Sequence, residues 1–243
     1  PFKKKLDLND RNNLILKTLK FCRKNKLTND SFKITLEKNI PISAGLGGGS
    51  SNSASIIRYF LKHNKNEKVS KIVNLSQKLG ADIPACLYSQ PLLAEGIGEK
   101  ISLVNFNKNL DIGVVLINPN IQLSTRDVFT NFKFKENLQE SFITKVDNFN
   151  DFKELSIIGN DLKSTAIGIV PEVEKILRIF ENGNNCISYG MSGSGPTCFG
   201  IFKSKSSAFD FNNKFKNMFK INNFWFWSGG ILEKSKRELI LPL

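Results

Sequence analysis

The residues best suited to chemistry lie in a glycine- and serine-rich stretch, PISAGLGGGSSNSAS, at positions 41–55. Alternating apolar residues predict a strand over 31–38, directly before it, and helical spacing predicts a helix from Ser50 or Ser51 to Leu61, directly after it. Its glycines, Gly45 and positions 47–49, allow left-handed backbone and close approach of a ligand. The positive amino end of the helix would lie beside the loop, so this order of elements indicates a phosphate-binding loop.

The alternative for this stretch is a tight glycine turn capped by serine. The stretch lacks the lysine that follows the last glycine of a P-loop, and it lacks the acidic residue of a dinucleotide-binding fingerprint. The hydroxyls of Ser50 and Ser51 can donate to a phosphate oxygen, and Ser51 is the candidate ligand for Mg²⁺, which prefers oxygen.

A single carboxylate follows in the segment GADIP, at positions 80–84. Asp82 is either an ordinary helix N-cap or a group that orients or deprotonates a substrate hydroxyl for attack on a γ-phosphate. The residues alone leave these two roles equally open. A second small-residue loop, GMSGSGPT at 190–197, packs against the first loop, contacts a substrate phosphate, or forms a plain turn.

The remaining periodicities predict a mixture of helices and strands without strict alternation, which indicates an α+β fold. Helices are expected from Asn9 or Asp10 to Lys24 and over 70–79, 81–88, 124–132, 152–167, 171–182 and 206–219, with strands over 91–94, 112–117, 187–189, 197–202 and 223–227. A polar stretch at 105–109 predicts two domains, at positions 1–108 and 109–243.

Composition narrows the functional classes. The 243 residues are 40% hydrophobic and 23% charged, which is typical of a globular protein, and no apolar run reaches the roughly 20 residues of a membrane span. Four scattered cysteines are expected to be reduced core residues. With His63 as the only histidine, a histidine triad or zinc site is excluded. The net charge of +13 is interpreted as lysine-rich solvated surface rather than a nucleic-acid site.

Taken together, these segments resemble the GHMP kinases, a superfamily named after galactokinase, homoserine kinase, mevalonate kinase and phosphomevalonate kinase. Positions 41–55 resemble the ATP loop, 80–84 the segment of the catalytic aspartate, and 190–197 the third motif. The forms GLGGGSSN, GADIP and AEGIGE (94–99), with Asn160 to Leu162 and Pro171–Glu172, are most similar to the 4-diphosphocytidyl-2-C-methyl-D-erythritol kinases.

The resemblance implies a two-domain α+β fold: an N-terminal domain like the second domain of a small-subunit ribosomal protein, a ferredoxin-like C-terminal domain, and a site in the cleft between. It implies transfer of the ATP γ-phosphate to the 2-hydroxyl of a small-molecule substrate, 4-diphosphocytidyl-2-C-methyl-D-erythritol. This reaction is a step of the non-mevalonate route to isoprenoid precursors. ATP and Mg²⁺ are the expected cofactors, and a cytoplasmic enzyme with no nucleic-acid or membrane partner is expected. The implied site residues are catalytic Asp82; ATP-loop Pro41, Ile42, Ser43, Ala44, Gly45, Leu46, Gly47, Gly48, Gly49, Ser50 and Ser51; substrate-side Asp82, Thr125, Gly193 and Ser194; and Ser51 for the metal.

One departure from the family pattern concerns its beginning. Family members start with a Pro-Ala-Lys-Ile-Asn type segment, whose lysine assists catalysis, and then a Gly-Tyr-His segment that contacts cytidine, and neither is present. We therefore expect an N-terminally truncated chain with little or no kinase activity. The other readings are a kinase for another acceptor such as homoserine, mevalonate or a sugar alcohol, a non-catalytic nucleotide-binding module, and a nucleic-acid binder. The oligomeric state is not predicted.

Overall fold

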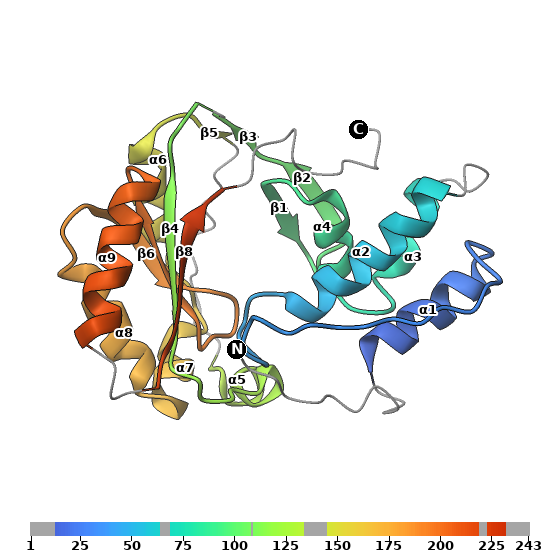
Figure 1. The fold of residues 1–243 in the computed structure, drawn as a ribbon, viewed down its shortest axis with the longest axis horizontal. Helices are drawn as coiled ribbons and strands as arrows, with labels where there is room; N and C mark the ends of the chain where they lie inside the picture. Colours follow the sequence, from blue (N-terminus) through green and yellow to red (C-terminus); the bar gives the residue numbers. More distant parts are fainter. Residues whose placement is uncertain (1–12, 64–68, 108, 134–144, 219–222, 232–243) are drawn as a thin grey trace. The chain divides into compact units, whose positions relative to one another are not determined.

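The computed structural model describes residues 13–63, 69–107, 109–133, 145–218 and 223–231 (Figure 1). The described residues form two compact units, the first from 13–39 and 47–104 and the second from 40–46 and 105–231. The glycine-rich stretch is therefore divided between the units after Leu46. The architecture is α+β, which confirms the expected fold class.

The first unit is built from helices and one hairpin. Its elements are α1 (Leu14–Lys24), α2 (Gly48–His63), α3 (Val69–Ser76), α4 (Asp82–Tyr88), and the antiparallel strands β1 (Leu92–Glu95) and β2 (Lys100–Leu103). The Asn13 side chain caps α1 by accepting a hydrogen bond from the Ile15 amide at 2.9 Å. The caps expected at Asn9 and Asp10 lie outside the described residues. The core of this unit joins α1, α2, α3 and α4 through buried Cys22, Ala54, Ile57, Phe60, Ile72, Ile83 and Leu87.

The strand expected over 31–38 is wrong. This segment keeps the alternating pattern, with Ile34 and Leu36 half-buried between exposed neighbours, and the Phe32 ring lies 5.0 Å from that of Phe60. However, no strand is assigned there, and a strand requires backbone partners from elsewhere in the chain. The period of two predicted which side chains would be buried, but a ladder depends on a neighbour that the local sequence does not specify.

The second unit contains an antiparallel sheet in the order β6-β7-β4-β8 and a short parallel pair, β3 and β5. In chain order its elements are β3 (Asn105–Phe106), β4 (Gly113–Asn118), α5 (Thr125–Asn131), β5 (Lys145–Val146), α6 (Phe149–Ile158), α7 (Lys163–Ile169), α8 (Glu172–Glu181), β6 (Cys186–Met191), β7 (Cys198–Phe202), α9 (Lys205–Met218) and β8 (Trp225–Gly230). Figure 1 shows α9 running alongside β4 and β8. Buried Val115, Ile117, Phe180, Phe202 and Phe211 form its core, with the Phe180 and Phe211 rings stacked at 5.4 Å.

The single helix expected over 152–167 is instead two helices, α6 and α7. Gly159 takes a φ of +76°, and the Asn160 amide group donates to the carbonyl oxygens of Met191 at 2.9 Å and Gly193 at 2.8 Å. A continuous helix would not leave Asn160 in place to make these contacts. Tertiary hydrogen bonds therefore override helical periodicity here.

The expectation of reduced core cysteines is confirmed in part, because Cys22 and Cys198 are buried but Cys86 and Cys186 are only half-buried. All four cysteines are free, and burial raises the pKa of the Cys22 and Cys198 thiols to about 12. His63 is the exposed last residue of α2, against the Tyr59 ring. The helices of the described chain include none long and apolar enough to cross a bilayer.

Candidate active site

The glycine-rich stretch turns sharply before it becomes helical. Gly45 and Gly47 take left-handed φ values of +70° and +62°, a conformation that glycine adopts without strain. Helix α2 then begins at Gly48 rather than at Ser50 or Ser51, so the expected helix start is wrong by two or three residues. Two glycines of the stretch supply the turn, and the next two form the first positions of the helix.

The amino end of α2 offers free backbone donors and a nearby cation. The first helical hydrogen bond runs from the Ser51 amide to the Gly47 carbonyl at 2.8 Å, so the amides that precede it have no partner within the helix. A Cβ built on Gly48 would lie 3.6 Å from the Lys38 Nζ. The ammonium of Lys38 therefore lies beside this helix end, where a phosphate is favoured. The sequence interpretation missed Lys38, whose only signal is its place three residues before Pro41.

The second glycine loop packs directly on the first. The Ser192 hydroxyl donates to the Gly45 carbonyl at 2.8 Å, and a Cβ on Gly45 would lie 2.5 Å from the carbonyl oxygens of both Ser192 and Gly195. A Cβ on Gly193 would in turn lie 3.2 Å from the Gly45 carbonyl oxygen. Of the roles open to residues 190–197, packing against the first loop is confirmed. The two backbones approach so closely that only glycine fits at position 45.

Polar side chains around the second loop tie it to three neighbouring elements. The Thr125 hydroxyl, at the start of α5, lies 2.9 Å from that of Ser194. The Asn118 amide group, at the end of β4, donates to the buried Thr197 hydroxyl at 2.7 Å. With the contacts of Asn160, these bonds hold the loop from both ends. Three of the predicted substrate-side residues, Thr125, Gly193 and Ser194, are thus brought together.

Asp82 is the first residue of α4, and its carboxylate is exposed. Ala81 occupies the N-cap position and makes no side-chain capping bond, so the ordinary N-cap role for Asp82 is wrong. In the described chain the carboxylate has no hydrogen bond or ion pair. The Asp82 charge affects the nearby thiol of Cys86. Burial has the largest effect and raises the pKa of this thiol, the Asp82 charge raises it further, and the Arg58 charge lowers it.

Packing of α4 holds Asp82 at the surface. Ile83 and Leu87, spaced one helical turn apart, are 0% and 1% exposed, and burying each contributes about 2–3 kcal/mol. Arg58 of α2 donates to the Cys86 carbonyl at 2.8 Å and fixes the helix from its other side. Asp82 is therefore held on a well-packed helix, and its carboxylate is not used to cap that helix.

The turn between β1 and β2 lies against the start of the same helix. Gly98 has a φ of +95°, and a Cβ there would lie 2.8 Å from the Ala81 carbonyl oxygen. The Glu99 carboxylate accepts from the Ile97 amide at 2.7 Å and closes the turn. The segment AEGIGE thus supports the backbone that carries Asp82.

The residues fit a magnesium ion bound mainly by substrate. Among the described residues, no group of three or more histidine, cysteine or acidic side chains is placed to hold a metal. Mg²⁺ needs only one or two protein oxygens when substrate phosphates and water complete its shell. The exposed Ser51 hydroxyl and the Asp82 carboxylate are donors of this kind, both in the first unit. Positions 41–46, Thr125, Gly193 and Ser194 belong to the second unit, and 47–51 to the first.

Comparisons with known proteins identify the family of the chain. The family described as GHMP kinases N terminal domain matches residues 13–90, and GHMP kinases C terminal matches residues 136–221. A 4-diphosphocytidyl-2-C-methyl-D-erythritol kinase of Prochlorococcus marinus (strain MIT 9515) is 37% identical over 242 residues, covering 92% of this chain and 76% of the relative. One of Chelativorans sp. (strain BNC1) is 37% identical over 177 residues, covering 72% of this chain and 59% of the relative.

Solved structures show the same fold at low identity. A crystal structure of 4-(cytidine 5'-diphospho)-2C-methyl-D-erythritol kinase superimposes with a TM-score of 0.70 at 22% identity, over 93% of this chain and 81% of that one. Homoserine kinase from Cytophaga hutchinsonii gives a TM-score of 0.63 at 14% identity, over 91% and 76%. On the two family matches and the extent of the Prochlorococcus similarity, the chain belongs to the GHMP kinase family.

Proposed function

We propose that the protein transfers the γ-phosphate of ATP to the 2-hydroxyl of 4-diphosphocytidyl-2-C-methyl-D-erythritol. The proposal of this acceptor is supported by the 37% identity, over 92% of this chain, to a relative named as that kinase. The observation that carries the chemistry is the exposed carboxylate of Asp82, held on a packed helix with no cap or ion pair to occupy it. We assign positions 1–108 to the ATP-binding domain and 109–243 to the C-terminal domain.

Each residue has a distinct role in the proposed reaction. The free amides at the start of α2 bind the phosphate oxygens of ATP, and the Lys38 ammonium balances their charge. The Asp82 carboxylate accepts the proton of the acceptor hydroxyl while the hydroxyl oxygen attacks the γ-phosphorus. ADP leaves with the electrons of the P–O bond that breaks. Ser51 would help the phosphates to hold Mg²⁺, and the ion would supply positive charge to the phosphate chain.

The second glycine loop positions the first one. Ser192 and Gly193 contact Gly45 and so restrict the movement of the loop that precedes α2. The paired hydroxyls of Thr125 and Ser194 are assigned to the acceptor side. Holding the reactants in the correct geometry lowers the activation free energy by several kcal/mol, the order of magnitude expected for proximity alone.

The test is release of ADP from magnesium-ATP by the natural full-length protein, offered this acceptor, homoserine, mevalonate or galactose. We expect turnover with the diphosphocytidyl acceptor, and a fall in kcat of about 10²- to 10⁴-fold in Asp82→Asn. The exposed Asp210 of α9 gives the matched control, Asp210→Asn, which should retain wild-type kcat.

The outcomes separate the two parts of the proposal. Turnover with homoserine, mevalonate or galactose alone would overturn the acceptor and leave the kinase chemistry standing. Turnover by Asp82→Asn within about threefold of the wild type, well short of the loss of a general base, would overturn the role of the carboxylate.

A further inference from the structure

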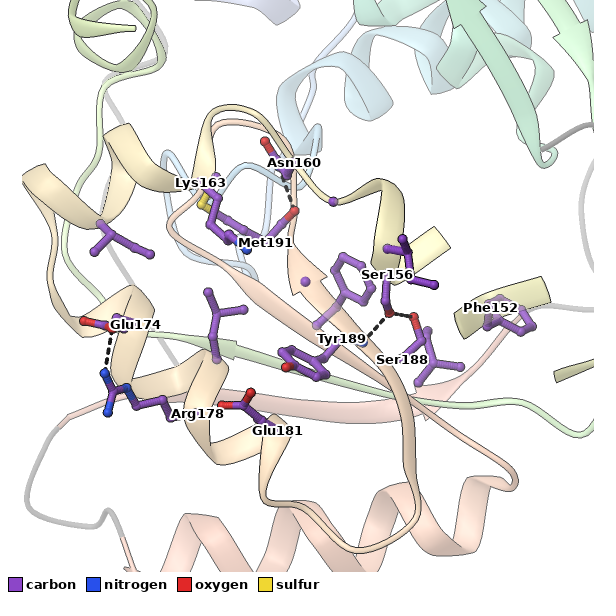
Figure 2. A pocket seen from close by; sticks show the side chains of 17 residues that line it. Phe152, Ser156, Asn160, Lys163, Glu174, Arg178, Glu181, Ser188, Tyr189 and Met191 are labelled. Carbon is purple, nitrogen blue, oxygen red and sulfur yellow. Dashed lines mark hydrogen bonds and ion pairs between the residues drawn. The ribbon is translucent and has the colours of Figure 1, made fainter. Parts of the chain in front are cut away.

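A cavity in the second unit is lined by none of the residues assigned to phosphate transfer. It has a volume of about 800 Å³, and neither Asp82 nor any of residues 41–51 lines it. Its floor is one face of β6 and β7, and its walls come from α6, α7 and α8 (Figure 2). Cavities of roughly 300–1,000 Å³ are typical of sites for small molecules.

Apolar and aromatic side chains form most of this cavity. Tyr189 and Phe199 lie on the sheet floor, and Phe152, Ile157 and Leu177 come from the helices. Gly190 keeps the floor open, because a Cβ there would lie 3.0 Å from the Phe199 ring. Ile157 is 83% exposed on α6, so an occupant of the cavity would bury apolar surface against it. The lining thus suits a flat, apolar body.

The polar groups of the floor are already satisfied by one another. The hydroxyls of Ser156 and Ser188 lie 2.5 Å apart, and Ser156 also accepts from the Tyr189 amide at 3.2 Å. The pKa of the Tyr189 hydroxyl is raised by burial first and then by the charge and hydrogen bond of Glu181. An apolar ligand over this floor would therefore leave no polar group unpaired.

One charge on the wall remains unbalanced. Arg178 and Glu174 form an ion pair at 2.8 Å, and Glu181 is engaged with Tyr189. The Lys163 ammonium has no ion pair or hydrogen bond within the described chain, and Figure 2 shows this side chain beside Met191. An anionic group placed there would gain a charge-assisted contact.

We propose that this cavity binds a small amphipathic anion, with a ring-sized apolar body over Tyr189 and Phe199 and one carboxylate or phosphate beside Lys163. The site is independent of the proposed kinase reaction. It adjoins the candidate active site through Asn160, which lines the cavity and also donates to the carbonyls of Met191 and Gly193. An occupant therefore contacts the residue that holds the second glycine loop.

The test compares two probes of the same shape that differ in charge, naphthoate and its neutral counterpart naphthamide. Each is titrated into the isotope-labelled protein, and dissociation constants are taken from backbone amide shifts. We expect shifts centred on residues 186–191 and 156–163, and naphthoate to bind about fivefold more tightly than naphthamide, as expected for one partly exposed charge pair.

Three variants test the lining, and two of them form a matched pair. Lys163→Gln should abolish the preference for naphthoate while leaving naphthamide binding unchanged, whereas Lys153→Gln, an exposed lysine of α6 outside the cavity, should keep the preference. Ile157→Gln should weaken both probes by about three- to tenfold through lost apolar contact. Both lining changes alter exposed side chains and should leave folding intact.

Three results would overturn the proposal. The first is an equal affinity for the two probes in the wild type. The second is a set of amide shifts that lies outside the cavity lining. The third is a dimer, detected by light scattering, that dissociates in Ile157→Gln, because the cavity would then be covered by a second copy of the chain.

Discussion

Replacing Asn160 by aspartate should release the second glycine loop from the turn between α6 and α7. The Asn160 Nδ2 donates to the carbonyls of Met191 at 2.9 Å and Gly193 at 2.8 Å, while its Oδ1 accepts from the Leu162 amide at 2.9 Å. Aspartate has nearly the same shape and keeps the acceptor. It loses both donors and places a negative charge beside two carbonyl oxygens.

The magnitude follows from the two lost hydrogen bonds. Each contributes about 1 kcal/mol net, and repulsion between the carboxylate and the carbonyls adds to this, so we expect a loss of about 2–3 kcal/mol of unfolding free energy. For a domain of this size, 1 kcal/mol corresponds to roughly 2–4 °C in Tm, giving a fall of about 4–12 °C. The loop should also open locally, because the bonds that hold it are missing.

The assay combines calorimetry with amide hydrogen exchange over residues 190–197. Asn182→Asp is the matched control, since its Nδ2 makes a single exposed bond to the Arg178 carbonyl at 2.8 Å at the end of α8. That change should cost about 1 kcal/mol or less, including the unfavourable charge at a helix carboxyl end. Equal stability of the two variants, with unchanged exchange over 190–197, would refute the reasoning.

Further predictions concern backbone contacts and buried thiols. Gly45→Ala should raise the KM for ATP and cost at least about 2 kcal/mol of stability, because its Cβ would lie 2.5 Å from two carbonyl oxygens; Gly168→Ala, in α7 with nothing within 4 Å, should be neutral or stabilising by about 0.5–1 kcal/mol. Gly98→Ala should lower kcat beyond what its loss of stability explains, since its Cβ would press on the backbone before Asp82, the proposed general base, and unchanged kcat would contradict this role for the hairpin. Because burial raises the pKa of Cys22 and Cys198 to about 12, both should resist iodoacetamide at pH 8. These thiols are neutral in the folded and unfolded chain below the ordinary pKa of 9.0, so their contribution to stability is complete there and is lost as pH rises from 9 towards 12, which urea unfolding at pH 8 and 10 would show.

Local signals predicted the elements whose ends are set by their own residues. The helices expected over 124–132 and 171–182 are present as α5 and α8, and each begins one residue later than expected. Ser124 caps α5 by accepting from the Asp127 amide at 3.3 Å, and Pro171 occupies the N-cap position of α8. The wrong predictions concern elements whose structure depends on residues distant in the sequence. Residues 31–38 have strand periodicity without an assigned partner, and the predicted helix over 152–167 is broken where Asn160 binds the second loop.

For the candidate site, the sequence indicated candidate residues but not their environment. The segment GADIP left two roles equally open for Asp82, a helix N-cap and a catalytic group. Only the structure, in which Ala81 is the N-cap, excludes the first of these. Lys38 was missed because its relevance comes from the distance between its ammonium and the start of α2. Both facts depend on how α2 and α4 pack with their neighbours, which no spacing rule encodes.

The glycines of residues 45–49 meet different physical requirements, so they should differ in tolerance to substitution. Gly45 is fixed by a steric contact with the second loop, and Gly47 only by its φ of +62°, with nothing within 4 Å of an added Cβ. Left-handed backbone costs a side-chained residue about 1–2 kcal/mol, whereas a Cβ overlapping two carbonyls requires the loops to move apart. Gly45 is therefore required by the contact with the second glycine loop, whereas Gly47 is required only by the turn itself. Substitution of Gly45 should disturb the structure of residues 190–197, while substitution of Gly47 should disturb only the turn.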